Sequence, residues 1–191
     1  MRSSPFTVVY DACVMYPAPL RSFLMYVSLE GCYRARWTAQ IHDEWKRNLL
    51  KNRPDFTQEK LDKISSLMGQ AVPDCLVTGY DALINGLTLP DQDDRHVLAA
   101  AIRCGAGVIV TMNLKDLPPA ALSQYGVEAQ HPDEFLFDLM DLDLAAVLNA
   151  ASKHRASLKN PELTAQEYLD MLERQGLTQT CRKLAAYSLL I

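Results

Sequence analysis

Four carboxylates that follow strands or lie on helices are the residues of this sequence best suited to chemistry: Asp11, Glu44, Asp94 and Asp116. If they converge they repel one another, because two unit charges about 5 Å apart cost roughly 3 kcal/mol at an effective dielectric constant of about 20. A bound cation removes that repulsion, and carboxylate oxygens favour Mg²⁺ or Mn²⁺. The set therefore favours metal-assisted chemistry, provided that the fold brings its members together.

Asp11 directly follows the apolar, β-branched run FTVVY at residues 6–10. This run predicts a buried strand. Burying an unpaired ionised carboxylate costs several kcal/mol, so a chain rarely places one in such a run without a partner or a metal. We interpret Asp11 as a functional carboxylate at the carboxyl-terminal end of this strand.

Asp94 begins a helix that the pattern predicts from about Asp94 to Cys104, with Gly105 as its C-cap. At about 100° per residue, Asp94 shares one stripe of that helix with the apolar residues Leu98 and Ile102. An acidic residue at a helix start is also an ordinary N-cap or dipole partner. The alignment with the buried stripe favours the functional interpretation.

Asp116 follows the run AGVIVT at residues 106–111, which predicts a strand covered on both faces in a parallel sheet. Ligands of open α/β sheets bind outside the carboxyl ends of the strands. Asn113 and Asp116 are expected at that edge.

Glu44 lies on a predicted helix whose buried face is formed by Ile41, Trp45 and Leu49. It borders that face, whereas its neighbour Asp43 points away from it. Most helical glutamates are simply solvated, so Glu44 alone is weak support for a site.

The composition is that of an ordinary soluble protein, with 191 residues, 49% hydrophobic and 22% charged. No apolar run approaches the roughly 20 residues of a membrane span, and Asp11 interrupts the N-terminal apolar segment, so a cytoplasmic location without membrane contact is expected. The net charge of −4 argues against a broad nucleic-acid-coating surface.

Five scattered cysteines predict reduced core residues, and the four scattered histidines are interpreted as structural.

Strands and helices alternate through the first two thirds of the chain, which predicts a parallel sheet. Strands are expected at about 6–10, 75–78, 106–111 and 127–130, and the α/β part is expected to close near residue 137. Helices near 142–158, 164–175 and 178–189 follow. We therefore predict two domains, at residues 1–137 and 138–191.

Three sequence motifs resemble those of the PIN-domain nucleases, and most closely the VapC-type toxin ribonucleases. They are VVYDACVMYP at the first strand, DDRHVLAAAI at the third motif, and VIVTMNLKDLP, which is similar to the T-x-N-x-x-D fourth motif. The resemblance covers about residues 6–135. It departs from the family at Cys13, where an Asn usually stands two residues after the first Asp.

The resemblance implies a three-layer α/β/α domain with a parallel sheet, followed by a helical extension. It assigns catalysis to the four carboxylates named above, with Asp11, Asp94 and Asp116 as metal ligands and Asp91 and Asp93 as possible substitutes. Thr111 and Asn113 would orient ligands or substrate. The implied activity is phosphodiester hydrolysis by water activated on Mg²⁺ or Mn²⁺. RNA, a cognate antitoxin and a second copy of the chain are the implied partners.

A PIN scaffold that binds RNA or a protein, and has lost efficient catalysis through the altered first motif, is the main alternative. The sequence lacks the second Asp of haloacid-dehalogenase phosphatases and has no P-loop. A receiver-like use of Asp11, Thr111 and Lys115 is disfavoured because the last two share one loop.

Lys153, Arg155 and Lys159, with His154 between them, cluster near the end of a helix in the predicted extension. They are candidates for contact with RNA phosphates. A solvated helix surface is the ordinary alternative.

Overall fold

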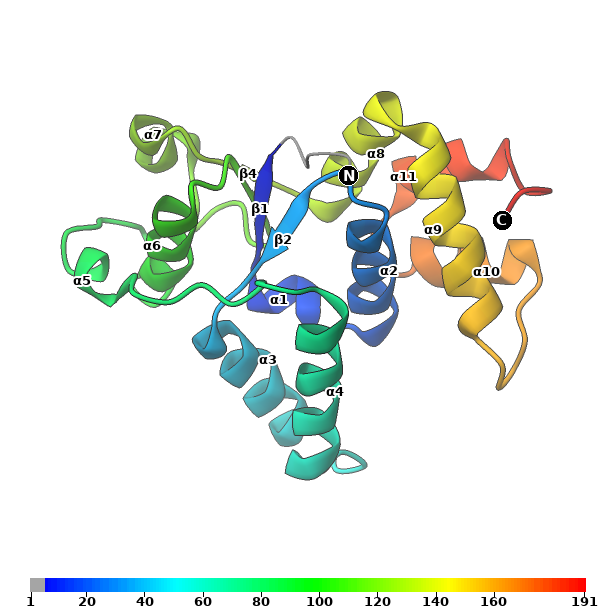
Figure 1. The fold of residues 1–191 in the computed structure, drawn as a ribbon, viewed down its shortest axis with the longest axis horizontal. Helices are drawn as coiled ribbons and strands as arrows, with labels where there is room; N and C mark the ends of the chain where they lie inside the picture. The colour runs from blue at the N-terminus through cyan, green and yellow to red at the C-terminus, as the bar shows by residue number, and fades with distance from the viewer. Residues whose placement is uncertain (1–5) are drawn as a thin grey trace. The chain divides into compact units, whose positions relative to one another are not determined.

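The computed structural model describes residues 6–191, and these divide into two compact units. The first, called the sheet unit, comprises residues 6–16 and 33–131; the second, called the helical unit, comprises residues 17–32 and 132–191. Figure 1 shows the elements of both in chain order. Across the described range, none of the helices combines the length and apolar character needed to cross a membrane.

The sheet unit contains four parallel strands in the order β2-β1-β3-β4: β1 (Thr7–Tyr10), β2 (Arg34–Arg36), β3 (Val108–Val110) and β4 (Glu128–Gln130). Val8 pairs with Val108 on one side of β1 and with Ala35 on the other. All of β1 is buried, as its β-branched run predicted. The α/β class and the parallel sheet are therefore confirmed.

The prediction of a strand at residues 75–78 is wrong, because this segment forms a single parallel bridge, between Leu76 and Trp37. Trp37 donates its N–H to the carbonyl of Cys75 and accepts from the N–H of Val77. Thr38 then caps the next helix, so β2 leaves the sheet edge before a longer ladder can form.

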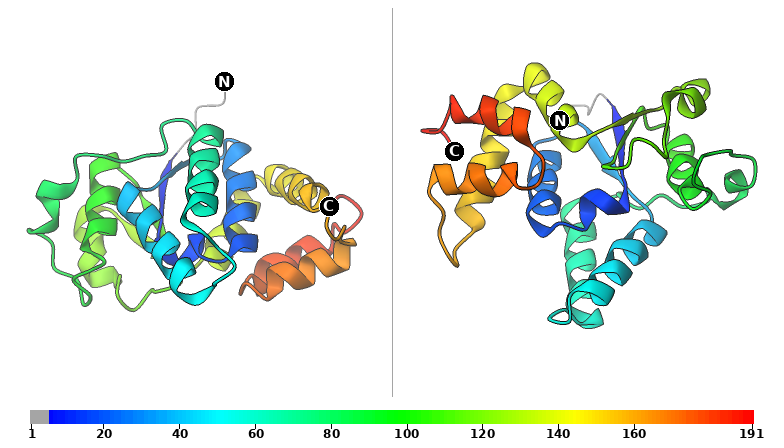
Figure 2. Two further views of the ribbon diagram at one scale, coloured as in Figure 1. Left: turned by 90° about the horizontal axis from the view of Figure 1, so that it is seen from below. Right: turned by 180° about the vertical axis from the view of Figure 1, so that it is seen from behind.

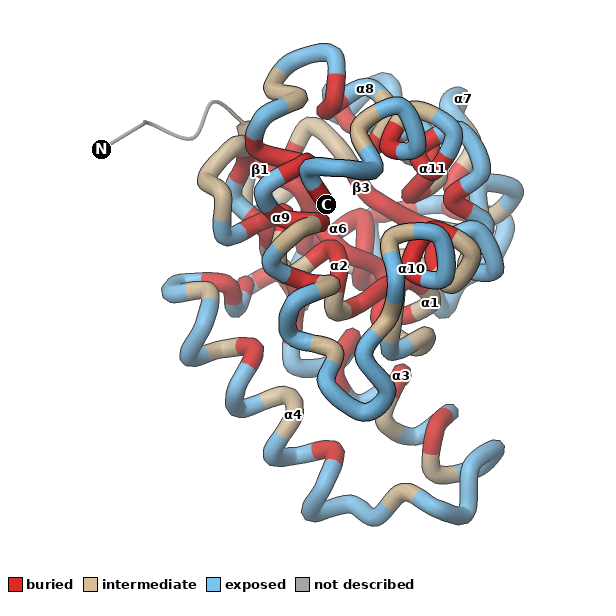
Figure 3. Tube along the Cα trace, turned by 90° about the vertical axis from the view of Figure 1, so that its right-hand side faces the viewer, coloured by how far each residue is buried: buried red, intermediate tan, exposed pale blue. Residues whose placement is uncertain are grey.

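The sheet unit also contains three longer helices: α3 (Ala39–Asn52), α4 (Gln58–Ala71) and α6 (Arg95–Cys104). Its shorter helices are α1 (Ala12–Met15), α5 (Asp81–Ile84), α7 (Pro119–Leu122) and the 3-10 helix η1 (Ser123–Tyr125). α6 packs on β1 and β3, whereas α3 packs on α1 and α4. Thr38 and Thr57 cap α3 and α4 through their hydroxyls, and Gly105 closes α6 at φ 65°. α4 buries only Leu61 and Met68, so most of this helix is exposed (Figure 3).

The helical unit contains five helices: α2 (Ala18–Leu29), α8 (Pro132–Leu142), α9 (Leu144–Ser157), α10 (Ala165–Glu173) and α11 (Thr178–Ala185). α2 packs mainly on α9, and α10 lies beside α11 (Figure 2). Helix α8 was not predicted, although Phe135, Leu136, Leu139 and Met140 give it a buried face. The predicted domain boundary after residue 137 falls inside α8 and stays a prediction.

His154 lies at the centre of the helical unit and is fully buried. It stacks on Phe23 and contacts Tyr26 in a tilted arrangement, and its Nδ1 lies 3.0 Å from the hydroxyl of Tyr168. Burial lowers the pKa of His154 to about 4. This residue therefore contributes to the core and does not belong to a solvent-facing basic cluster.

Candidate metal centre and active site

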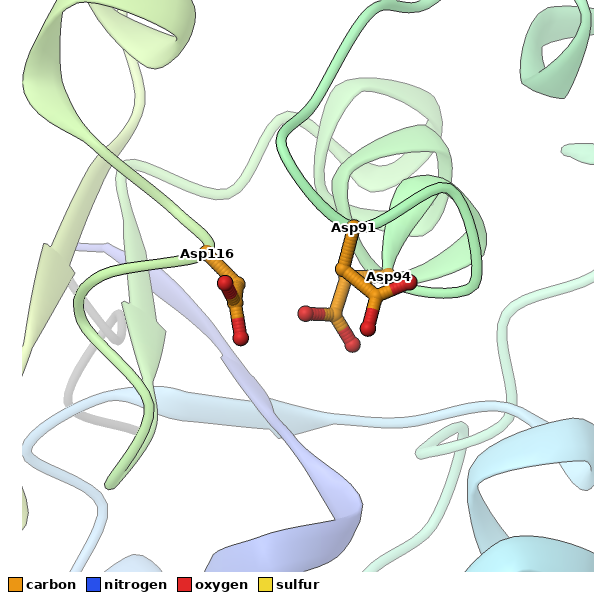
Figure 4. Close-up of side chains that lie close together, drawn as sticks. All are labelled: Asp91, Asp94 and Asp116. Carbon is orange, nitrogen blue, oxygen red and sulfur yellow. The ribbon is translucent and has the colours of Figure 1, made fainter.

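Three aspartates from two loops offer oxygen atoms that all lie within 4.8 Å of one another: Asp91, Asp94 and Asp116. Asp91 and Asp94 come from the turn before α6, and Asp116 faces them from the loop after β3 (Figure 4). The carboxyl end of β3 and the amino end of α6 therefore present their carboxylates to the same point.

Asp94 occupies the N-cap position of α6, but its side chain makes no capping hydrogen bond. Its φ of −81° and ψ of −6° are helical, unlike the extended backbone of a typical capping residue. The side chain faces the other acidic residues instead. Burial, followed by the charges of Asp11, Asp91 and Asp116, raises the pKa of Asp94 to about 6. The ionised form of this carboxyl group is thus destabilised in the absence of a cation.

Asp11 is 6% exposed and is held by three donors. Its Oδ1 accepts the N–H of Ala12 at 2.6 Å, and its Oδ2 accepts the Thr111 hydroxyl at 2.7 Å and the Cys13 thiol at 3.0 Å. The first of these bonds makes Asp11 the N-cap of α1, a role that the sequence did not indicate. Asp11 lies outside the group of three, yet its charge is the largest carboxylate effect on Asp94.

Thr111 connects the ends of β1 and β3. Its hydroxyl donates to Asp11 and accepts the N–H of Asn113 at 2.9 Å. The amide of Asn113 in turn donates to Asp116, so the loop after β3 holds its own carboxylate. The T-x-N-x-x-D motif thus forms a hydrogen-bonded chain from Asp11 to Asp116.

Cys13 stands where the resemblance led us to expect an Asn, and its sulfur lies inside the same network. The thiol donates to Asp11, and the sulfur accepts the N–H of Met112 at 3.2 Å. Burial and the charge of Asp11 raise the pKa of Cys13 to about 12, so the thiol keeps its proton and remains a donor.

Glu44 is set apart from the aspartates. Its Oε1 lies 2.8 Å from Nε2 of His96, and its side chain is 25% exposed. It does not belong to the group of three, and it is absent from the groups that raise the pKa of Asp94. Asp43, its neighbour on α3, is exposed and pairs with Lys46. The structure therefore places Asp91 with Asp94 and Asp116, and pairs Glu44 with a histidine.

The basic candidates of the helical unit all have partners. Lys153 lies 2.9 Å from Glu30, Arg155 donates to the carbonyl of Leu163 at 2.9 Å, and Lys159 lies 3.6 Å from Glu162. Their contact with RNA stays a prediction.

Two residues at the site were underrated from the sequence. Asp91 was treated only as a substitute, although three aspartates after Pro90 already placed several carboxylates in one turn. His96 was taken as structural because a lone histidine on a helix carries no spacing signal. Only the packing of α3 near the start of α6 reveals its contact with Glu44.

The fold and the site define a class of protein, and this chain belongs to the PIN-domain family. The pattern of that family, described as "PIN domain", matches residues 7–115. A second pattern, described as "VapC50 C-terminal domain", matches residues 132–186.

The chain is similar to a curated protein of Mycobacterium tuberculosis (strain ATCC 25618 / H37Rv) named "Putative ribonuclease VapC50". The two are 42% identical over 97 residues, which are 51% of this chain and 57% of the relative. The match thus spans little more than half the length of that relative. No solved structure shows a significant match to this chain.

Proposed function

We propose that this protein is a metal-dependent endoribonuclease that hydrolyses phosphodiester bonds, and that it is the toxin of a toxin–antitoxin pair. The observation that carries the proposal is the group formed by Asp91, Asp94 and Asp116, in a chain of the PIN-domain family. Such a group has little structural use by itself, because its mutual repulsion opposes folding.

The donor set fits a small divalent ion. Every ligand offered is a carboxylate oxygen, which suits Mg²⁺ or Mn²⁺ better than the softer metals. Burial, followed by the charges of neighbouring aspartates, raises the pKa of Asp94 to about 6, and a bound cation would favour its ionised form. A bound Mg²⁺ or Mn²⁺ would supply an activated water and neutralise charge on the scissile phosphate.

The protein groups have separate tasks in this proposal. Asp94, Asp116 and Asp91 hold the ion, and Asp11 completes the acidic site from the end of β1. Thr111 keeps Asp11 oriented, and Asn113 keeps Asp116 oriented, each through a hydrogen bond to the carboxylate. These fixed contacts reduce the reorganisation needed when the ion and the phosphate bind.

RNA is the proposed substrate because the curated relative is named a ribonuclease. An antitoxin protein and a second copy of the chain are proposed partners, and the cytoplasm is the proposed location. The match of residues 132–186 to the VapC50 C-terminal domain supports placement with that kind of protein.

The test is cleavage of labelled single-stranded RNA by the purified protein with Mg²⁺, with Mn²⁺ or with a chelator. We expect fragments only when a metal is present, and none from Asp94→Asn. Asp43→Asn is the matched control, because this exposed residue lies on the same helix as Glu44 and pairs with Lys46. Cleavage at full rate in chelator would contradict the proposed metal centre.

A toxin role is tested separately by expressing the wild-type chain and Asp94→Asn in a bacterial host. We expect growth arrest from the active chain only, and relief when a neighbouring antitoxin gene is expressed with it. Equal growth of both strains, at equal protein levels, would remove the toxin assignment while leaving the nuclease assignment in place.

The second candidate is a PIN scaffold that binds RNA but cleaves it poorly, and Cys13 is the observation that raises it. The thiol nevertheless retains a hydrogen bond to Asp11, as described above. We therefore expect Cys13→Asn to cleave at least as fast as the wild type, and Cys13→Val to lose several-fold in kcat. RNA binding without cleavage by both the wild type and Cys13→Asn would favour the scaffold.

A further inference from the structure

The pair formed by Glu44 and His96 joins two helices at the edge of the candidate site. Glu44 lies on α3, and His96 lies in the first turn of α6, two residues after Asp94. Glu44 Oε1 and His96 Nε2 lie 2.8 Å apart, so the ring nitrogen and the carboxylate are in direct polar contact, which is an ion pair when the ring is protonated. A side chain from the aspartate-bearing helix thus determines where the glutamate of α3 can lie.

Burial differs between the two partners. His96 is only 3% exposed, whereas Glu44 is 25% exposed. The ring is therefore almost fully removed from solvent, whereas the carboxylate side chain remains partly accessible. In residues 6–191, Nδ1 of His96 has no hydrogen-bond partner, so the contact with Glu44 is the one polar contact that the ring makes there.

The contacts of Glu44 all involve the same oxygen. His96 Nε2 lies near Oε1, and Gln40 donates to Oε1 at 3.5 Å. Within the described part of the chain, no hydrogen bond to Oε2 is found. One oxygen of Glu44 is thus anchored, and the other is available.

We propose that His96 is a positioning residue that anchors Glu44 through Oε1 and leaves Oε2 for the hydrated ion or the RNA. Glu44 is then placed by a side chain of α6 as well as by its own helix. This inference rests on the proposed nuclease function for its kinetic test.

A purely structural role for the same pair is the alternative. A buried histidine that links two helices stabilises the fold even if Glu44 has no function. The two roles differ in what a substitution changes: a structural role affects unfolding only, whereas a positioning role also affects the folded protein's handling of metal and RNA.

The experiment compares His96→Leu, which removes the donor, with His96→Gln, whose side-chain amide N–H can replace Nε2–H. We expect His96→Leu to lower kcat for RNA cleavage by about 10- to 100-fold with little change in KM, the range found when the support of a metal-site group is lost. His96→Gln should recover most of that loss. Equal losses in both variants, or an unchanged kcat in folded His96→Leu, would overturn the proposal.

A double-substitution test uses Glu44→Gln. If His96 acts through Glu44, the variant carrying both Glu44→Gln and His96→Leu should be no slower than Glu44→Gln alone. Losses that multiply would mean that the two residues act independently.

Mn²⁺ binding, measured without RNA, separates this inference from the proposed function. We expect His96→Leu to bind Mn²⁺ several-fold more weakly than the wild type and His96→Gln to bind nearly as well. A wild-type protein that binds Mn²⁺ but does not cleave RNA would remove the nuclease function, and the affinities would still test the positioning role. Equal Mn²⁺ affinity in all three would contradict it.

His42→Gln is the matched control. His42 is also a buried histidine, lies on α3 like Glu44, and accepts a hydrogen bond from Trp45 at Nδ1. We expect this variant to lose stability without changing kcat or Mn²⁺ affinity. Circular dichroism melting of each variant identifies those that are folded at the assay temperature.

Discussion

Asp133 in the helical unit and Asp11 in the sheet unit are equally buried, at 6% exposed, yet their surroundings differ. Asp133 accepts the N–H groups of Gln179 and Thr180 at 2.9 Å each, at the start of α11. Backbone donors at a helix amino terminus compensate its charge. Asp11 also has donors, but it faces a second carboxylate, Asp94, whose pKa it raises.

This difference shows that burial alone does not identify a functional carboxylate. The informative quantity is whether the surrounding protein compensates the charge. In the helical unit, the buried carboxylate completes a helix end and stabilises the fold. In the sheet unit, burial and the charges of neighbouring aspartates raise the pKa of Asp94, so its ionised form is disfavoured.

The largest expected effect comes from removing one carboxylate in each unit. Asp94→Asn should lower RNA cleavage by more than about 100-fold, because even supporting residues of metal sites reach that value. It should leave the metal-free protein as stable as the wild type or more stable, since it removes a repelling charge. Cleavage rates and melting temperatures of the same preparations provide the measurement.

Asp133→Ala is the counterpart of that variant. We expect it to cost about 1–2 kcal/mol of stability, as for the loss of a helix cap, without affecting the metal affinity of the folded protein. If Asp94→Asn proves the more destabilising of the two in the absence of metal, the contrast between the units is wrong.

The second prediction concerns metal binding. Mg²⁺ or Mn²⁺ should raise the melting temperature of the wild type, because a ligand at about 100 times its Kd adds about 2.7 kcal/mol to the stability of the native state. For a chain of this size, that corresponds to roughly 5–10 °C. Asp94→Asn should lose most of the shift, and Asp133→Ala should keep it. A flat melting temperature for the wild type across a millimolar titration argues against the site.

The third prediction is that the two units respond oppositely to pH. His154 has a pKa of about 4 in the folded protein and an ordinary value of 6.5, so the unfolded chain binds more protons between these values. Its contribution to stability is therefore complete above about pH 6.5 and is lost as the pH falls, by at most about 1.4 kcal/mol per pH unit. Asp94 has a pKa of about 6 in the folded protein and an ordinary value of 3.8, so the folded chain binds more protons between these values. Its contribution to stability therefore falls as the pH rises from about 3.8 to about 6.

The Asp94 contribution is the smaller of the two because this side chain is partly exposed and salt screens it. In metal-free buffer, Asp94→Asn should make stability rise more steeply between about pH 4 and 6. His154→Gln should flatten or reverse the slope. Denaturant unfolding at each pH measures both, and parallel curves for the two variants would contradict the assignment.

Sequence patterns predicted the strands and helices that carry the site wherever one local signal dominated. The buried run before Asp11 and the glycine that ends α6 are such signals. The prediction of a strand at residues 75–78 failed because a strand pairs over several residues, whereas this segment forms one bridge, between Leu76 and Trp37. Helix α8 was missed because its acidic residues obscured the apolar face beneath them.

The site itself was predictable only in part. The aspartates follow from strand ends and a helix start, which fix position along the chain. The contact of Glu44 with His96 depends on how α3 packs near α6, and no spacing in the sequence records that contact. The partners of Lys153 and Arg155 were hidden for the same reason, because Glu30 and Leu163 lie on other segments.

The smallest expected effect concerns the basic residues of the helical unit. Replacing Lys153, Arg155 and Lys159 together with Ala would flatten the salt dependence of RNA binding by about two units of slope if all three neutralised phosphates, at roughly 0.7 each on single strands. Lys153 and Arg155 must give up Glu30 and a backbone carbonyl to do so. Lys159 has only an exposed pair with Glu162, which is worth little.

We therefore expect a slope change of at most about 0.7, arising from Lys159, together with a loss of stability from the other two. Single variants separate these effects: Lys159→Ala should carry the whole change in slope, and Lys153→Ala should lower the melting temperature without affecting RNA affinity. Binding titrations of a noncleaving Asp94→Asn background over a range of salt concentrations provide the measurement. A slope change near two would show that RNA displaces Glu30 and the Leu163 carbonyl, and the helical unit would then be an RNA-binding surface as the sequence suggested. No change in any variant would show that none of these three residues neutralises a phosphate.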